Sequence, residues 1–209
     1  MKMMRRRALI GQGDSLPRGY TRCKYLESTG EQYINTGIYP SMQTNYTLKY
    51  ELTSPAMKRG DHSIFGTRNT TATDGYLFDI WLFHSSFDVS FTLSDTHLDF
   101  RNEQAVSINT QNQVKKVGNA FYLNDELIWT SSATELKAYR PILLFRSFNS
   151  TGLPCRIYSC VLIEGERKIM AVVPALDKAG RPCMFDTVTR TPYYNIGAGE
   201  FLYKVVGEQ

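Results

Sequence analysis

The chain has 209 residues, which is enough for one well-buried domain, and a β-sandwich of this size commonly stays undivided. Its formal net charge is +4, and four of the positive charges precede residue eight, at Lys2, Arg5, Arg6 and Arg7. The remainder is close to neutral and has no basic stripe, which argues against a nucleic-acid-binding surface. Thirteen Tyr, eleven Phe and fifteen Gly, with clusters of Ser, Thr and Asn, are typical of an all-β protein rich in turns.

The first 18 residues have a charged start but no long apolar run behind it. Only Ala8, Leu9 and Ile10 are apolar between the arginines and Gly11, so we expect neither a secretory signal nor a membrane span. Two interpretations stay open: a disordered start with no further role, or an arm that docks on a partner protein. The arm would use its basic and apolar side chains, which are Arg5, Arg6, Arg7, Leu9 and Ile10.

Short strands joined by tight turns are predicted from residue 19 onward. In 19–40, tyrosines and isoleucines recur between Gly19, Gly30 and Gly37, which suits a pleated surface broken by turns. Residues 46–52 then alternate, with Tyr46, Leu48, Tyr50 and Leu52 on one side and Thr47, Lys49 and Glu51 on the other. This alternation predicts a half-buried strand with one exposed face.

Further apolar runs extend the pattern toward the C-terminus. Residues 64–66 begin a strand, and 76–83 are apolar on both faces, which predicts a strand in the middle of a sheet. The other strand candidates are 89–93, 98–100, 105–108 and 142–145, together with a hairpin over 119–129 that turns at Asn124 and Asp125. About a dozen strands without a helix predict two packed antiparallel sheets in a jelly-roll arrangement.

The four cysteines are Cys23, Cys155, Cys160 and Cys183. No CxxC pair or histidine-rich partner accompanies them, so a zinc site is not expected and reduced, packed thiols are the default. Cys155 and Cys160 lie five apart on a predicted strand. We therefore expect them on opposite faces, roughly 16 Å apart at about 3.3 Å per residue, and unable to form a disulfide.

Catalytic patterns find little support in the sequence. A retaining sandwich glycosidase needs two carboxylates about 5 Å apart, and the nearest candidates are Glu164 and Glu166 at a turn and the loop 95–99. There is no Gly-x-Ser-x-Gly motif, and the three histidines stand in different loops or strand ends, at His62, His84 and His97. We therefore expect neither an enzyme nor a cofactor. A calcium ion stays open as an alternative, held by Asp95, His97 and Asp99.

The strand predicted over 76–83 carries the candidate binding site. One of its faces holds Asp79 and Trp81, whereas the other face is purely aliphatic and aromatic. Sugars are held by aromatic stacking plus directed hydrogen bonds, so Asp79, Trp81 and His84 are predicted to contact a glycan. The alternative is that Trp81 packs beneath a loop while Asp79 bonds a neighbouring turn. Three other large aromatic residues near turns either bind a ligand or plug the end of the sandwich: Trp129, Tyr193 and Tyr194.

Two long blocks of the sequence carry a family resemblance. The first is 19–40, which reads GYTRCKYLESTGEQYINTGIYP. In the second, 156–201, a strand ending in Val-Pro-Ala is followed by Phe-Asp and by a closing Gly-x-Gly-x-Phe. In this order the blocks resemble the opening and the ending of concanavalin A-like (laminin-G-like) β-sandwich proteins. Such proteins occur in phages and prophages of gut bacteria and in some bacterial surface proteins, and they usually carry other residues in place of Cys23 and Cys160.

The resemblance implies a domain over 19–209 behind an arm over 1–18, with 32–38 and 196–202 closing the same sandwich. It implies a non-enzymatic virion surface protein of a phage, made in the host bacterial cytoplasm, such as a head fibre, a capsid decoration protein or a tail-fibre accessory. The domain would bind host or mucosal glycans while the arm holds other virion proteins, and several copies, for example a trimer, would assemble. The alternatives are an architectural protein that cements neighbouring subunits and a divergent glycosidase.

Overall fold

A computed structural model of the protein describes residues 15–54, 62–68, 77–83, 88–94, 96–100, 108–148 and 151–207, with the backbone alone for 77–83, 88–91, 96–100 and 151. The described residues form seventeen strands and no helix. Accordingly, this part of the chain contains no helix that could cross a bilayer. Residues 1–14 of the expected arm, and 105–107 of one predicted strand, lie outside the described residues.

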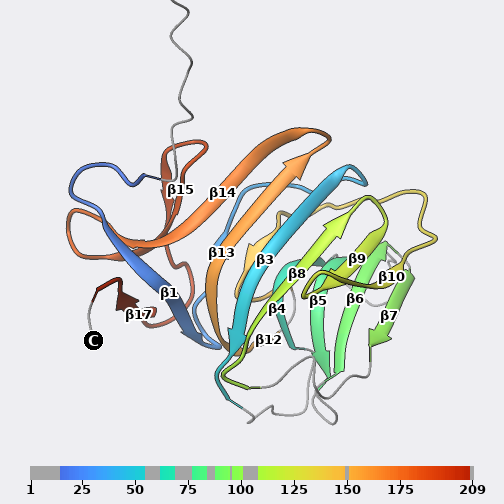
Figure 1. The fold of residues 1–209 in the computed structure, drawn as a ribbon, viewed down its shortest axis with the longest axis horizontal. Helices are drawn as coiled ribbons and strands as arrows, with labels where there is room; N and C mark the ends of the chain where they lie inside the picture. Colours follow the sequence, from blue (N-terminus) through green and yellow to red (C-terminus); the bar gives the residue numbers. More distant parts are fainter. Residues whose placement is uncertain are drawn as a thin grey trace, which may run out of the picture.

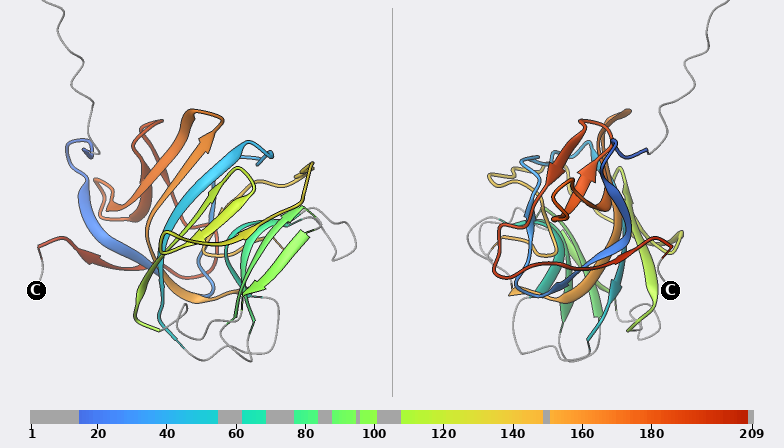
Figure 2. Two further views of the ribbon diagram at one scale, coloured as in Figure 1. Left: turned by 45° about the vertical axis from the view of Figure 1, so that its right-hand side comes forward. Right: turned by 90° about the vertical axis from the view of Figure 1, so that its left-hand side faces the viewer.

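The larger sheet contains ten strands. In the order in which they pair, they are β10 (Glu126–Thr130), β9 (Ala120–Leu123), β8 (Gln111–Val117), β3 (Thr44–Leu52), β13 (Pro154–Glu164), β1 (Thr21–Thr29), β14 (Arg167–Leu176), β15 (Pro182–Asp186) and β16 (Thr191–Tyr193). The tenth, β17 (Leu202–Val205), pairs with β1 and lies beside it at the edge of the molecule in Figure 1 and Figure 2. The last strand of the chain is therefore paired with the first.

The smaller sheet contains seven strands. Its main path is β2 (Ile34–Asn35), β11 (Leu143–Leu144), β4 (His62–Arg68), β5 (Leu77–Phe83), β6 (Asp88–Ser94) and β7 (Thr96–Phe100). The short β12 (Thr151–Gly152) pairs with β4 in parallel, whereas the other described pairs are antiparallel. In Figure 1, β4 to β7 lie on one side of the molecule next to β8 to β10, and β1, β14 and β15 lie on the other side.

The core lies between the two sheets and is built from alternate residues of their strands. On β3, Tyr46, Leu48, Tyr50 and Leu52 are each at most 2% exposed. The ring centroid of Tyr46 lies 4.8 Å from that of Phe65 on β4, so the two sheets are in direct contact. These contacts confirm the predicted alternation on this strand and the predicted all-β sandwich.

The outer face of β3 departs from the prediction at one residue. Lys49 is exposed and Thr47 is half-buried, but Glu51 is only 6% exposed. Arg156 on the neighbouring β13 donates to the Glu51 carboxylate at 2.6 Å, and the Tyr158 hydroxyl donates to its second oxygen. An acidic side chain can be buried on this face because the adjacent strand supplies charged and polar donors.

Strand β8 was not among the predicted strands. Its inward-facing residues Asn112, Val114 and Lys116 are at most 3% exposed, and two of them are polar. Asn112 Oδ1 accepts a hydrogen bond from Asn124 Nδ2 at 3.0 Å. Lys116 Nζ donates to two main-chain carbonyls at 3.2 and 2.8 Å. These partners satisfy the buried polar groups, but the strand shows no apolar alternation from which it could be predicted.

A β-bulge overturns the prediction that Cys155 and Cys160 face opposite sides. The pairing of β13 with β3 skips Tyr158, which is an extra residue in the bulged strand. Because side chains alternate along a strand, one extra residue brings both cysteines to the core side. Both are 0% exposed. All four cysteines of the chain are buried and free, as the reduced, packed state requires.

The buried thiols predict a loss of stability in alkali. Burial raises the pKa of Cys155 and of Cys160 well above the ordinary thiol value. Each contributes stability that is complete below the unfolded pKa of about 8.5 and falls by about 1.4 kcal/mol per pH unit above it. Lys116 acts in the opposite direction, because burial lowers its pKa to about 8 and its deprotonation stabilises the folded state.

We therefore expect the free energy of unfolding to decline from about pH 9 to about pH 10. In Cys160→Ala the decline should be less steep, and the two slopes should differ by about 1.4 kcal/mol per pH unit. Urea unfolding at a series of pH values measures both slopes. The test compares how the free energy of unfolding changes with pH in the two proteins. A loss of stability that Cys160→Ala causes equally at every pH does not affect this comparison. Equal slopes in the two proteins would contradict the burial of this thiol.

Candidate functional site

Hydrogen bonds join the two ends of the sandwich. The Tyr33 N–H donates to Asn195 Oδ1 at 3.1 Å, and the Ile196 N–H donates to the Tyr33 carbonyl at 3.0 Å. Gln32 Nε2 donates to the Ala198 carbonyl at 2.9 Å. The contact that was expected between the first and last strand segments is therefore present, and it joins the two blocks of sequence on which the family resemblance rests.

The Gln32 side chain is held in one orientation by its own turn. It is 5% exposed, and its Oε1 accepts hydrogen bonds from the Thr29 N–H at 2.8 Å and from Ser28 Oγ at 3.2 Å. These bonds leave Nε2 directed at the carbonyl of Ala198. The Ser-Thr-Gly-x-Gln part of the first block is thus a turn that holds the C-terminal loop in place.

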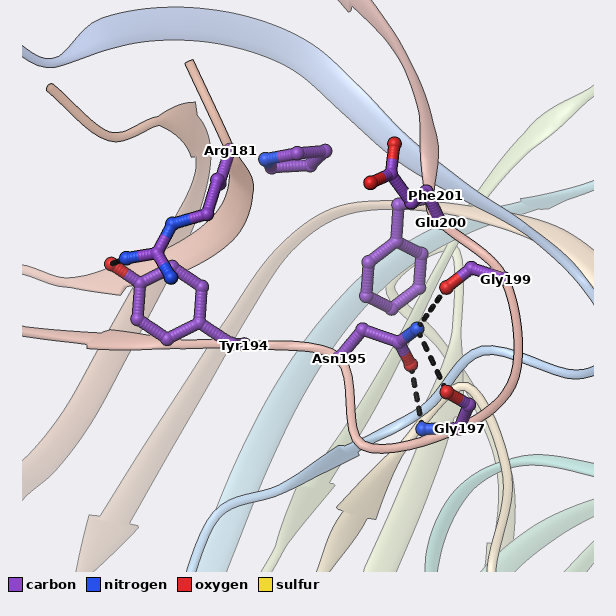
Figure 3. Close-up of a pocket in the computed structure, with 8 residues that line it drawn as sticks. Arg181, Tyr194, Asn195, Gly197, Gly199, Glu200 and Phe201 are labelled. Atoms are coloured by element: carbon purple, nitrogen blue, oxygen red, sulfur yellow. Dashed lines mark hydrogen bonds between the residues drawn. The ribbon is translucent and has the colours of Figure 1, made fainter. Parts of the chain in front are cut away.

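Asn195 closes this loop from within. Its Oδ1 accepts from the Gly197 N–H at 2.8 Å, and its Nδ2 donates to the carbonyls of Gly197 and Gly199 at 3.2 and 2.7 Å (Figure 3). A Cβ atom on Gly197 would lie 1.9 Å from the Glu31 carbonyl oxygen, which is far inside van der Waals contact. Gly197 is therefore required for the close approach of two backbone segments.

A pocket of about 270 Å³ opens beside the loop. It is lined by the start of β15 and by the segment between β16 and β17, with side chains or backbone from Arg181, Pro182, Tyr194, Asn195, Gly197, Gly199, Glu200 and Phe201. Figure 3 shows Arg181 and Tyr194 on one side and Glu200 and Phe201 on the other. Each side of the pocket thus contributes one charged and one aromatic side chain.

Arg181 is positioned by Asp177 and Tyr194. Its Nε donates to Asp177 Oδ2 at 2.9 Å, and its Cζ lies 4.5 Å from the centroid of the Tyr194 ring. The Tyr194 hydroxyl donates to the same carboxylate oxygen at 2.8 Å. The other oxygen accepts from the N–H groups of Ala179 and Arg181 at 2.8 and 3.0 Å. The aspartate is thereby saturated, and the guanidinium is fixed both in its plane and by stacking.

These hydrogen bonds also determine the protonation states of Asp177 and Tyr194. The N–H of Arg181, together with the other donors, holds the pKa of the Asp177 carboxyl well below its usual range. Burial and the hydrogen bond to Asp177 raise the pKa of Tyr194 to about 12. Asp177 is consequently ionised and Tyr194 protonated at neutral pH. Neither is suited to exchange a proton with a ligand near that pH.

The opposite side of the pocket combines an aromatic ring that is anchored in the core with an exposed carboxylate. Phe201 is 2% exposed, and its ring centroid lies 4.6 Å from that of Phe145, so Phe201 is anchored in the core. Glu200 is exposed, and within the described part of the chain it makes no hydrogen bond or ion pair. The pocket therefore sets a fixed donor on one side against an acceptor on the other.

The glycan-binding face predicted on β5 stays a prediction. Asp79 lies opposite Thr92, and Trp81 opposite Ser90, in the pairing of β5 with β6, where the backbone alone is described for β5. His84 lies outside the described residues. The strands that flank the pocket, β15 and β17, lie on the opposite side of Figure 1 from β5. The predicted face and the pocket are therefore two separate regions of the molecule.

The other aromatic candidates divide between core and pocket. The Trp129 ring lies 5.0 Å from that of Phe121, and Trp129 and Tyr193 are both partly buried against the core. These two side chains thus serve to plug the sandwich. Tyr194, in contrast, lines the pocket and carries the stacked guanidinium of Arg181.

The candidate ion site and most of the arm lie outside the described side chains. Asp95 lies outside the described residues, and only the backbone is described for His97 and Asp99. Within the described part of the chain, no cluster of three or more His, Cys, Asp or Glu residues could hold a metal ion. The residues that were expected to dock the arm also lie outside the described part, namely Arg5, Arg6, Arg7, Leu9 and Ile10.

The sequence pattern did not single out Arg181 or Glu200. One local signal was available, because Asp177 followed by Gly180 is typical of a turn in which an aspartate accepts main-chain N–H groups. That turn explains how Arg181 is held but not what it faces. Glu200 lies inside the Gly-x-Gly-x-Phe ending, and it comes to face Arg181 only through the path of the loop between β16 and β17.

Comparison with known proteins shows the fold. No family model and no curated protein matches the chain. Among solved structures, the chain is similar to a proposed carbohydrate binding protein from Bacteroides ovatus ATCC 8483, with a TM-score of 0.62 at 10% sequence identity. The match covers 90% of this chain and 61% of that chain, so this protein spans about three-fifths of the length of its neighbour. At this identity the likeness shows a shared all-β sandwich and nothing of the binding site.

The junction at Gly197 generates a stability prediction. We expect Gly197→Ala to destabilise the protein by about 3 kcal/mol or more, because the new methyl group meets the backbone of Glu31. Gly118→Ala is a suitable control, since no atom lies within 4 Å of its added Cβ, and its positive φ of 57° costs only about 1 kcal/mol. Thermal melting of both variants makes the comparison. Similar melting temperatures would contradict the close approach.

Proposed function

We propose that the protein is a non-enzymatic carbohydrate-binding protein of a phage virion surface. The observation that carries the binding proposal is the pocket in which the fixed guanidinium of Arg181 faces the carboxylate of Glu200, which has no partner among the described residues. Sugar hydroxyls both donate and accept hydrogen bonds, and the C–H faces of a sugar ring pack on apolar surface such as that of the half-buried Pro182. The shared fold with a proposed carbohydrate binding protein supports the same assignment.

Binding fits the pocket better than hydrolysis does. Glycoside hydrolysis requires two carboxyl groups in matched protonation states on either side of the bond that breaks. Among the described residues, Glu200 is the only carboxylate that lines this pocket. Asp177, which lies behind Arg181, is saturated by donors and has a pKa held well below its usual range, so it cannot act as the general acid. A divergent glycosidase would need a second carboxylate, which the described residues of this pocket do not supply.

The virion part of the proposal rests on the family resemblance and on the arm over 1–18. The end of the arm that the structure describes is tied to the sandwich. Arg190 Nη1 donates to the Ser15 carbonyl at 2.8 Å, and Leu16 packs against the small apolar cluster around Phe185. An anchored base would let the preceding residues reach a partner while the domain stays folded. The protein would serve as a head fibre, a capsid decoration or a tail-fibre accessory, in several copies such as a trimer.

One observation favours a second candidate, an architectural protein that cements neighbouring subunits. Strand β17 pairs with β1 alone among the described strands, so its second edge is open. Three large apolar side chains at this edge are 44 to 54% exposed: Leu202, Tyr203 and Val206. An open strand edge with exposed apolar side chains is a surface on which another protein chain can dock. This candidate predicts protein contacts and no affinity for sugars.

A glycan array with the full-length protein tests binding. We expect saturable binding to a subset of glycans, without a requirement for calcium. The variant Trp81→Ala should keep this binding, because β5 and the pocket lie on opposite sides of the molecule. Loss of binding in a folded Trp81→Ala protein would instead place the binding site on the face predicted from Asp79, Trp81 and His84. An array without binding, with or without calcium, would favour the architectural candidate.

Deletion of residues 1–14 tests the arm. The cut stops before Ser15 because Ser15 and Leu16 contact the sandwich, so the shortened protein should melt cooperatively, like the full chain. We expect it to stop co-sedimenting with phage particles while it keeps its glycan binding. If the shortened protein still sediments with the particles, attachment belongs to the sandwich domain and the arm has another role.

A further inference from the structure

The pocket also indicates which class of sugar it would hold, an inference that rests on the proposed function. We infer that it binds one neutral sugar residue that bridges Arg181 and Glu200 through two of its hydroxyl groups. The argument depends on the charges around the pocket, on the donors that Arg181 keeps free, and on the size of the cavity. Each of these is a property of described residues at the C-terminal end of the sandwich.

The charges disfavour an acidic ligand. Arg181 forms an ion pair with Asp177 at 2.9 Å, and the Asp177 side chain is only 6% exposed, so this pair is neutral as a unit. Glu200 adds a negative charge with no partner among the described residues. Among the described residues, Arg181 and Glu200 are the charged ones in the lining, so a carboxylated or phosphorylated sugar would meet a net negative site there.

The free donors of Arg181 favour a hydroxyl group as their partner. A guanidinium has five N–H groups in a fixed fork. Its Nε and Nη2 are directed to Asp177, and Nη2 also reaches the Tyr194 hydroxyl at 3.3 Å. No described residue accepts from Nη1, and the side chain is 66% exposed. Nη1 can therefore donate to a sugar oxygen from a guanidinium whose position is already set, which lowers the entropic cost of binding.

Glu200 complements this donor from the other side of the pocket (Figure 3). An ionised carboxylate only accepts, so it selects a hydroxyl that donates. A sugar ring meets both requirements at once, since each of its hydroxyls is a donor and an acceptor. The half-buried Pro182 also lines the pocket, and the C–H face of a sugar ring can pack against its side chain.

The size of the cavity limits the ligand to a single residue. Its volume of about 270 Å³ lies below the range of about 300 to 1,000 Å³ that is usual for drug-sized ligands. The charged side chains at the pocket, those of Arg181 and Glu200, are both exposed, so the cavity opens to solvent. This geometry suits the terminal residue of a glycan whose remainder extends into solvent.

Ligand-observed NMR titrations of the full-length protein test the inference. The neutral probes are the methyl glycosides of glucose, galactose and mannose. The acidic probes are methyl glucuronide and N-acetylneuraminic acid, and glucosamine is the cationic probe. We expect at least one neutral glycoside to bind at least tenfold more tightly than either acidic sugar. Glu200→Gln and Arg181→Met should each weaken that binding at least tenfold.

Matched controls lie at the far end of β14. Glu166→Gln and Arg167→Met make the same chemical changes in an exposed hairpin turn, and they should leave binding unchanged. Asp177 keeps three donors in Arg181→Met, and Glu200→Gln preserves shape at an exposed position, so both pocket variants should fold. Thermal melting of each variant checks this expectation.

The possible outcomes separate the inference from the proposed function. Tighter binding of an acidic sugar, or of glucosamine alone, would overturn the neutral class while glycan binding stands. Neutral sugar binding that Glu200→Gln leaves unchanged would overturn this pocket as the site. If no probe binds and the glycan array is also empty, the carbohydrate-binding function itself fails.

Discussion

The structure depends on the junction at which Gln32 and Tyr33 meet the loop after β16. Three hydrogen bonds cross this junction, and the backbone of Gly197 lies so close to Glu31 that no side chain fits between them. The bonds matter because they tie the opening of the domain to its ending, and so they close the sandwich. They also fix the loop that forms one wall of the pocket, which makes fold closure and pocket shape consequences of the same contacts.

Buried polar residues in the sandwich also depend on hydrogen bonds from distant segments. Lys116 and Asn112 occupy core positions on β8, and Glu51 is buried on the outer face, yet each has hydrogen-bond partners on neighbouring segments. A buried polar group without partners would cost several kcal/mol. The partners come from elements distant in sequence, so these residues are compatible with the fold only once the strands are in register. They favour one register over its alternatives.

In the pocket, the fixed side chain of Arg181 faces Glu200, which has no partner among the described residues. Asp177 and Tyr194 hold the guanidinium of Arg181, and the pKa shifts of both groups follow from these bonds. Glu200 has no such partners among the described residues and remains available to a ligand. Under the proposed function, the donors of Arg181 are positioned in advance for a ligand, while Asp177 and Tyr194 are held away from proton transfer near neutral pH.

Local patterns in the sequence determined the strand class, the alternation of Tyr46 to Leu52, the turn at Asn124 and the contact between the two ends, the last through the family resemblance. Each of these depends on residues that are close together in the chain or on recognisable blocks. The sequence alone selected Asp79, Trp81 and His84 as the glycan face, and that choice remains a prediction. Only the tertiary structure decided the rest. The bulge at Tyr158 reverses side-chain direction, β8 buries polar residues whose partners are distant, and Arg181 faces Glu200 because loop closure brings two turns together. These features arise from pairing between remote segments, which periodicity cannot encode.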